Sequence, residues 1–130
     1  MDIADWLDER QQRFISISDS IWEYAEIALA ETKSCALQAE DLEADGFRVT
    51  RNVGGLPTAF IAEWGNGGPV IGFLGEYDAL PDLSQKSQAE QEAVIPGGAG
   101  HGCGHNLLGT ASLAAASALK SWLEATGRPG

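Results

Sequence analysis

The sequence predicts an α/β fold in which helices pack on the faces of a mixed β-sheet. Three features support this fold: an amphipathic helical segment near the N-terminus, strand-like segments in the middle, and an alanine-rich helical segment near the C-terminus. A chain of 130 residues fits one domain and is long enough to bury a core. Apolar residues make up 44% of the chain, which excludes a disordered protein.

Two helices are expected in the first third of the chain. The segment 3–30 carries apolar side chains spaced mostly three, four or seven apart, namely Ile3, Leu7, Phe14, Ile17, Ile21 and Tyr24. After a break at residues 31–33, Ser34 is expected to cap a shorter helix that runs to Ala44, and Gly46 is expected to end it.

Three strands are expected next. Residues 47–51 alternate between apolar and polar side chains, and residues 57–64 are rich in apolar ones. Asn66, Gly67 and Gly68 form a strong hairpin-turn signal, because these residue types tolerate positive φ. The following segment, 69–77, contains a continuous apolar run, which predicts a strand covered on both faces.

A long loop and a last helix complete the expected elements. Residues 79–100 contain prolines, glycines and many polar side chains, and a loop of this length in a small domain is usually functional or disordered. The segment 106–125 predicts a helix rich in small residues, with Asn106 as its N-cap. An α/β protein would then form a parallel strand. We therefore expect the sheet to continue beyond Gly130 in further sequence.

Charge and cysteine content exclude several classes of protein. The net charge is −11 with only eight Lys and Arg residues, which argues against nucleic acid and anionic membranes as partners. The two cysteines are too few for a secreted disulfide scaffold, and the N-terminal segment does not resemble a signal peptide. We therefore expect a reduced, cytoplasmic protein in which Cys35 is buried. Glu26 and Glu31 are expected to be solvated.

A cluster of potential metal ligands precedes the last helix. Residues 100–106 read Gly-His-Gly-Cys-Gly-His-Asn and contain both histidines of the chain. Thiolate and imidazole are the natural ligands of zinc and similar metals, and the glycines let the backbone fold closely around an ion. A glycine-rich turn with helix-capping histidines and a buried Cys103 would explain the same pattern. A nucleophilic Cys103 is a third hypothesis, although His105 is poorly placed to act as its base.

Two acids follow the predicted buried strand. Glu76 and Asp78 are two residues apart, so their side chains point to the same side of an extended chain. Ligands of open α/β sheets bind beyond the carboxyl ends of the strands. The pair could bind a cation, or Asp78 could orient a ligating histidine by accepting a hydrogen bond from it. Solvated loop acids would show the same spacing.

Together, residues 75–81 and 100–106 resemble motifs of the aminoacylase and glutamate carboxypeptidase group of two-metal peptidases. Within this group the chain is similar to the amidohydrolase branch, and most of all to p-aminobenzoyl-glutamate hydrolases over residues 72–119. The segments 22–32 and 46–49 also fit, so the resemblance covers essentially the whole chain. It implies a zinc exopeptidase-like catalytic domain that is incomplete in this sequence.

The resemblance assigns roles to individual residues. Cys103 and His105 would be metal ligands, and Asp78 would be the catalytic-site residue that orients the metal shell. Glu76 stands where other branches carry a ligating histidine.

Two further residues are expected to line the site. His101 matches a motif position that is not a ligand in this branch. Asn106 replaces the aspartate that commonly follows the second histidine, which alters the surroundings of the metal or only keeps the helix cap.

The resemblance also implies a reaction. Two divalent ions, zinc or manganese, would support hydrolysis of the amide bond of an N-acyl or N-aroyl amino acid, a substrate like p-aminobenzoyl-glutamate or a dipeptide. The general-base Glu, the remaining ligands and a dimerisation domain would lie outside residues 1–130. We therefore expect an inactive N-terminal part of a catalytic domain, from an enzyme that is a homodimer or hetero-oligomer.

Two other functions remain open on the sequence. The chain could be a non-catalytic metal-binding or scaffold domain that keeps the motifs without the reaction. It could also be a small-molecule binding module that uses the loop 79–100.

Overall fold

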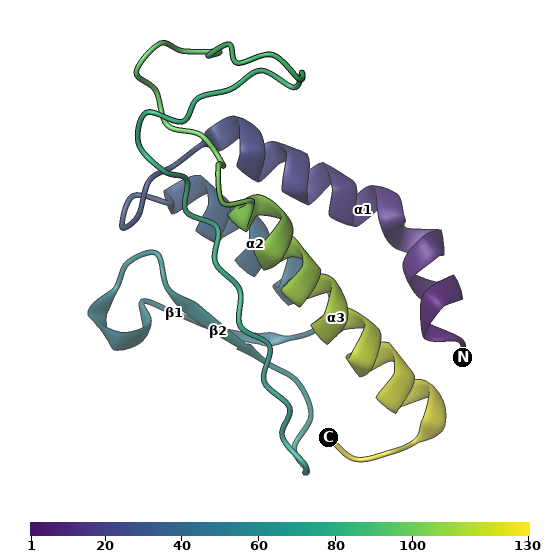
Figure 1. Cartoon of the computed structure of the whole chain (residues 1–130). Helices are drawn as coiled ribbons and strands as arrows, with labels where there is room; N and C mark the ends of the chain where they lie inside the picture. Colours follow the sequence, from purple (N-terminus) through teal and green to yellow (C-terminus); the bar gives the residue numbers. More distant parts are fainter.

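The computed structural model describes all residues, 1–130, as three helices and a two-stranded sheet. The elements follow the order α1 (Ile3–Tyr24), α2 (Thr32–Ala44), β1 (Arg48–Arg51), the short 3-10 helix η1 (Val53–Gly55), β2 (Phe60–Glu63) and α3 (His105–Thr126). Figure 1 shows α1 and α3 side by side, and the β1–β2 hairpin beside α2. The predicted combination of helices and strands is present, but the sheet has two antiparallel strands and is not the mixed sheet that the sequence predicts.

Helix α1 is shorter than the predicted segment 3–30. Asp2 caps its start, because the carboxylate accepts hydrogen bonds from the backbone N–H groups of Ala4 and Asp5 at 2.8 and 3.3 Å. The helix ends at Tyr24 because Ala25 adopts a left-handed conformation with φ 43° and its N–H bonds back to the Ile21 carbonyl. The spacing of apolar residues locates the helix correctly but does not predict the residue at which it ends.

Helix α2 is capped by a residue outside it, and Ser34 is not the cap as predicted. The Glu26 carboxylate accepts hydrogen bonds from the N–H groups of Lys33 and Ser34, both at 2.9 Å, and from the Ser34 hydroxyl at 2.8 Å. Burial raises the pKa of Glu26, but these hydrogen bonds outweigh it and bring the pKa below its ordinary value. The expectation that Glu26 is solvated is therefore wrong.

The core lies between α1, α2 and α3 and contains Trp6, Phe14, Ile17, Ile21, Leu42, Leu113 and Ala118. One ion pair supports the packing of α1 on α2: the Arg13 guanidinium donates to both carboxylate oxygens of Asp41 at 2.8 and 2.6 Å. Cys35 is buried, as the sequence predicts.

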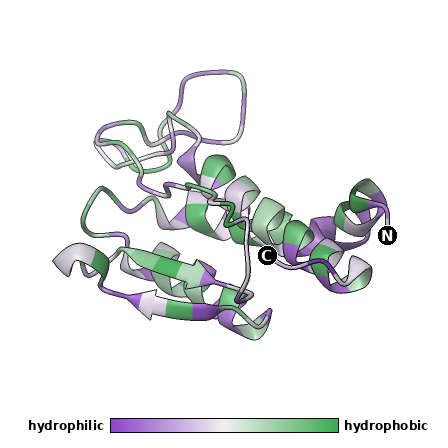
Figure 2. Ribbon diagram, turned by 90° about the horizontal axis from the view of Figure 1, so that it is seen from below, coloured by the Kyte–Doolittle hydropathy of each residue, from purple (hydrophilic) through white to green (hydrophobic).

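The two strands form an antiparallel pair in which Val49 faces Ala62 and Thr50 faces Ile61. They correspond to the predicted strands 47–51 and 57–64, with later starts. Figure 2 shows hydrophobic and hydrophilic residues interspersed along both strands, which is the pattern of a sheet with one covered face. Helix α2 packs against both strands and covers them.

The third predicted strand is absent. Residues 69–78 are extended, but they pair with no strand, and Val70 and Leu74 expose 89% and 92% of their surface. A buried strand needs hydrogen-bonding neighbours as well as covering helices, and no segment within these 130 residues supplies them. The prediction that this segment is covered on both faces is therefore wrong for this chain.

The loop 79–100 and the last helix follow the prediction more closely. The loop forms no helix or strand, and it projects beyond the start of α3 (Figure 1). Helix α3 begins one residue before the predicted segment 106–125. Its N-cap is Gly104, whose φ is 72°, so the prediction of Asn106 as the cap is wrong. No helix of the chain has the length and apolar character that crossing a membrane requires.

The exposed side chains of Val70 and Leu74 should make this chain self-associate. Unpaired extended segments and exposed apolar patches promote association between copies of a chain. Val70→Lys combined with Leu74→Lys should shift the sedimentation profile toward monomer. Ile15→Lys is a matched control, since Ile15 is 46% exposed on α1. An unmodified chain that sediments as a monomer at all concentrations would contradict this expectation.

Glu26→Gln should lower the free energy of unfolding at neutral pH by about 1 kcal/mol, because a charged helix cap is lost. The folded pKa of Glu26 is lowered, so its contribution is present above the ordinary pKa of 4.5 and is lost as pH falls through the folded value. Denaturant unfolding at neutral and acid pH tests this. The exposed Glu40→Gln is the control, and a pH-independent difference would contradict the assignment.

Candidate metal centre

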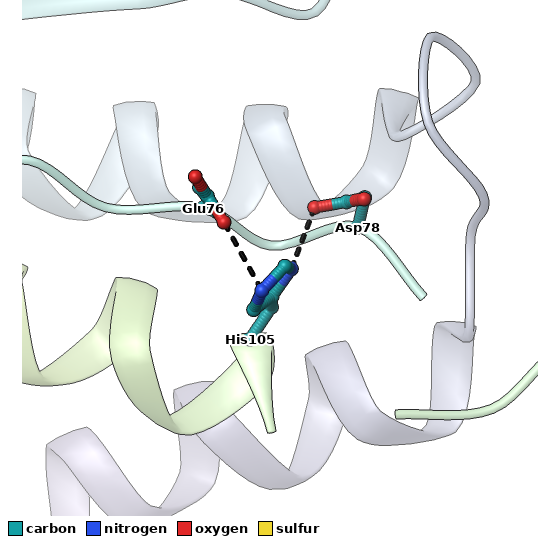
Figure 3. A group of neighbouring side chains, drawn as sticks. All are labelled: Glu76, Asp78 and His105. Carbon is teal, nitrogen blue, oxygen red and sulfur yellow. Dashed lines mark hydrogen bonds and ion pairs between the residues drawn. The ribbon is translucent and has the colours of Figure 1, made fainter. Parts of the chain in front are cut away.

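Three side chains from distant parts of the chain meet at the start of α3. The His105 imidazole lies between two carboxylates, with Nδ1 2.7 Å from Asp78 Oδ1 and Nε2 3.0 Å from Glu76 Oε2 (Figure 3). One ligand atom from each residue lies within 4.8 Å of the others. The structure thus brings together three of the residues that the sequence singles out.

Local backbone geometry places each of these residues. Glu76 and Asp78 are separated by one residue of extended chain, so both point to the same side, toward His105 (Figure 3). Gly104 takes the left-handed conformation that starts α3, which makes His105 the first residue of the helix. The free N–H groups of that helix end favour the nearby negative charges.

The two carboxylates at this cluster favour a positive charge at or beside His105. A neutral imidazole has one N–H, so it can donate to only one of the two carboxylates. With Nδ1–H donated to Asp78, the lone pair of Nε2 would face Glu76 unless a proton or a metal ion lies between them. The His105 and Asp78 side chains are 19% and 25% exposed, whereas Glu76 is 63% exposed and open to solvent. This donor set of one nitrogen and carboxylate oxygens fits a divalent metal.

Cys103 and His101 do not join this cluster. Cys103 is exposed and free, so the alternative in which Cys103 is buried within the turn does not hold. His101 turns toward α1, where its Nε2 lies 2.9 Å from the Ile21 carbonyl oxygen. Burial lowers the pKa of His101, partly opposed by the contact with Ile21. This contact joins the glycine-rich turn to the last turn of α1.

Asn106 has a packing role that the sequence does not reveal. Its side-chain amide is buried and donates to the hydroxyl of Ser18 at 3.0 Å and to the Ser18 carbonyl at 3.4 Å. These bonds join the first turn of α3 to α1. Asn106 therefore holds the helix that carries His105.

The sequence did not predict a set of hydrogen-bonded residues that includes Tyr77, the residue between Glu76 and Asp78. Glu31 is only 8% exposed, contrary to the expectation that it is solvated, and it accepts a 2.7 Å hydrogen bond from the Thr58 hydroxyl. The Thr58 carbonyl in turn accepts a hydrogen bond from the Tyr77 hydroxyl. The only signal in the sequence is the position of Tyr77 between the two acids.

A cavity of about 1060 Å³ opens beside the cluster, between β2, the extended segment 69–78 and α3. Glu76 and Asp78 line one end of it, and the rest is mostly apolar, including Phe60, Leu113 and Leu119. The two acids thus lie at the edge of a space large enough for a small molecule.

Known proteins are similar to this chain over nearly its whole length, although no protein family model matches it. The similar proteins are amide- and peptide-bond hydrolases, which confirms the resemblance to the amidohydrolase branch that the two motifs indicate. The chain is 53% identical over 129 residues to a subunit of the p-aminobenzoyl-glutamate hydrolase of Escherichia coli, which covers 98% of this chain and 27% of that protein.

Two mammalian proteins show the same relation at lower identity. The Xaa-Arg dipeptidases of Mus musculus and Homo sapiens are 34% and 32% identical to the chain, over 97% of it. The chain corresponds to 28% of each of them. It thus spans little more than a quarter of the length of the relatives it matches.

Asn106→Asp should lower the free energy of unfolding by roughly 2 kcal/mol, because a buried amide donor is replaced by a group that faces the Ser18 oxygens without a proton to share. Urea unfolding measures the loss. Asn66→Asp, at an exposed turn, is the matched control. Equal stability of the Asn106 variant and the unmodified chain would show that this contact does not hold α3.

Proposed function

We propose that this chain forms part of the catalytic domain of a metal-dependent amidohydrolase. The reaction would be hydrolysis of the amide bond of an N-acyl or N-aroyl amino acid or a dipeptide. The observation that carries the proposal is His105 held between Asp78 and Glu76, in a chain similar to named hydrolases over almost all of its residues.

His105 is the central ligand in this proposal. Asp78 accepts from Nδ1, which keeps the ring oriented with Nε2 directed outward to a metal. Glu76 lies on the Nε2 side, where its carboxylate could share the ion. Cys103 would be a further ligand, since its glycine neighbours allow the turn to bring the thiolate inward. His101 and Asn106 would support the site from its edge.

Bound zinc or manganese ions would polarise the scissile carbonyl and make a bound water acidic enough to attack it. The residues of this chain would hold and orient the ions, and the general-base Glu would come from outside residues 1–130. The apolar cavity next to Glu76 and Asp78 supports an aromatic or aliphatic acyl group as part of the substrate.

The names of the similar proteins support more specific proposals about substrates and assembly. A hydrolase of p-aminobenzoyl-glutamate and dipeptidases that act on Xaa-Arg both cleave an amide to an amino acid, so p-aminobenzoyl-glutamate and dipeptides are the first substrates to test. The bacterial relative is named as one subunit of its enzyme, which favours a protein that assembles with other chains, as either a homodimer or a hetero-oligomer. Free Cys35 and Cys103 fit a reducing compartment such as the cytoplasm.

The first test is metal binding by this chain. Zinc and manganese contents after dialysis and gel filtration should fall to background in His105→Ala. Cys103→Ser should weaken zinc more than manganese, because a thiolate prefers the softer ion. Ser87→Ala, at an exposed position in the loop 79–100, is the control. Equal metal content in the unmodified chain and in His105→Ala would contradict a site at His105.

The second test is activity of the longer protein in which this chain is embedded. Asp78→Asn should lower kcat/KM for p-aminobenzoyl-glutamate or a dipeptide by about 10- to 100-fold, the usual effect of losing a residue that orients a metal ligand. Asp82→Asn, in the exposed loop, is the control.

The outcome also separates the other candidate functions. Metal binding without hydrolysis of any N-acyl amino acid, N-aroyl amino acid or dipeptide would favour a metal-binding or scaffold domain. Ligand binding that survives chelation would favour a binding module.

A further inference from the structure

Tyr77 lies between the two acids in sequence, and its side chain contacts residues other than His105. Its hydroxyl donates a hydrogen bond to the Thr58 carbonyl, and its ring stacks on Phe60 with centroids 6.5 Å apart and planes at 16°. Neighbouring side chains of an extended chain alternate in direction. The orientation of Tyr77 therefore sets the side to which Glu76 and Asp78 turn.

The partner of Tyr77 is itself fixed. Thr58 is 8% exposed, and its hydroxyl donates to Glu31 Oε2 at 2.7 Å. Glu31 is the residue that precedes α2, so the hydrogen bonds run from the start of that helix through Thr58 to the Tyr77 ring. Such a chain of buried polar groups, each with a partner, favours one arrangement over others.

The direction of the hydrogen bond between Tyr77 and Thr58 is fixed by its groups. The Thr58 carbonyl has no proton, so the Tyr77 hydroxyl is the donor.

A second contact holds the same segment on the other side of Asp78. The Ala79 N–H donates to the Glu26 carbonyl at 2.7 Å, and Ala79 is 2% exposed. Asp78 is thus bracketed by two anchored residues. Residues 69–74 of the same segment have one hydrogen bond to the rest of the chain, from the Ser112 hydroxyl to the Leu74 carbonyl at 2.5 Å, and the side chains of Val70 and Leu74 are almost fully exposed.

We propose that Tyr77, held by Thr58 and Glu31, is a positioning residue that directs Glu76 and Asp78 toward His105. The functional role of Tyr77 in this inference rests on the proposed metal site. The hydrogen bonds on which it depends belong to the chain without metal, so they can be tested separately.

The test uses Tyr77→Phe, which keeps the ring that stacks on Phe60 and removes only the hydroxyl. Long-range ¹H–¹⁵N spectra of the histidine rings report the contact of His105 with Asp78 at a fixed pH and without metal. The chain has only two histidines, so a His101→Asn variant assigns the signals. In Tyr77→Phe the His105 ring nitrogens should shift toward the values of a free imidazole.

Matched variants separate positioning from a general loss of structure. Tyr24→Phe changes the other tyrosine, which is 36% exposed, and should leave the ring spectrum unchanged. Thr58→Val keeps the backbone carbonyl but removes the donor to Glu31, and it should shift His105 in the same direction as Tyr77→Phe. Thr58→Ser restores the hydroxyl and should restore the spectrum. Unchanged His105 shifts in both Tyr77→Phe and Thr58→Val, with native circular dichroism, would overturn the proposal.

A second measurement tests whether the hydrogen bonds among Tyr77, Thr58 and Glu31 affect metal binding. The dissociation constant for zinc should rise roughly tenfold in Tyr77→Phe and stay unchanged in Tyr24→Phe, as expected when a group that orients a ligand is lost. An unchanged zinc affinity in Tyr77→Phe would overturn the positioning role. If the unmodified chain binds no zinc, ligands from outside residues 1–130 are needed to complete the metal site, and the histidine ring spectra still decide what Tyr77 does.

Discussion

The candidate centre depends on how four residues of extended chain, 76–79, are held between packed elements. The Tyr77 hydroxyl donates to the Thr58 carbonyl, and the Ala79 N–H donates to the Glu26 carbonyl. The alternation of an extended backbone then presents Glu76 and Asp78 to the imidazole. Without these anchors, the two acids would lie on a segment as exposed as residues 69–74.

The other half of the centre is fixed through α1. Asn106 donates to Ser18, and His101 contacts the Ile21 carbonyl, so the glycine-rich turn and the first turn of α3 are fastened to the same end of that helix. Helices α1 and α3 share the apolar core, including Ile17, Ile21 and Leu113. Apolar packing places the helices, and a few buried hydrogen bonds set the position of His105 relative to the acids.

The sequence similarity to named hydrolases and the geometry of the chain are separate observations that bear on the same residues. Similarity to a subunit of p-aminobenzoyl-glutamate hydrolase and to dipeptidases covers nearly the whole chain but only about a quarter of those proteins. In the cluster of Glu76, Asp78 and His105, two carboxylates face one imidazole, and the three side chains are close enough together to hold a metal ion.

The sequence by itself determined the helical segments, the approximate positions of two strands, the long loop and the two motifs, because apolar periodicity, glycine and residue chemistry act locally. The hairpin that it predicts at residues 66–68 does not form, and the observed hairpin pairs β1 with β2 instead. The sequence could place Glu76 and Asp78 on one side of the chain and His105 at a helix start. Only the tertiary structure decided that Asp78 meets His105, that the Cys103 side chain is exposed, and that Glu26 and Glu31 are held by hydrogen bonds. It also decided that residues 69–77 form no strand, since pairing and burial depend on partners distant in sequence.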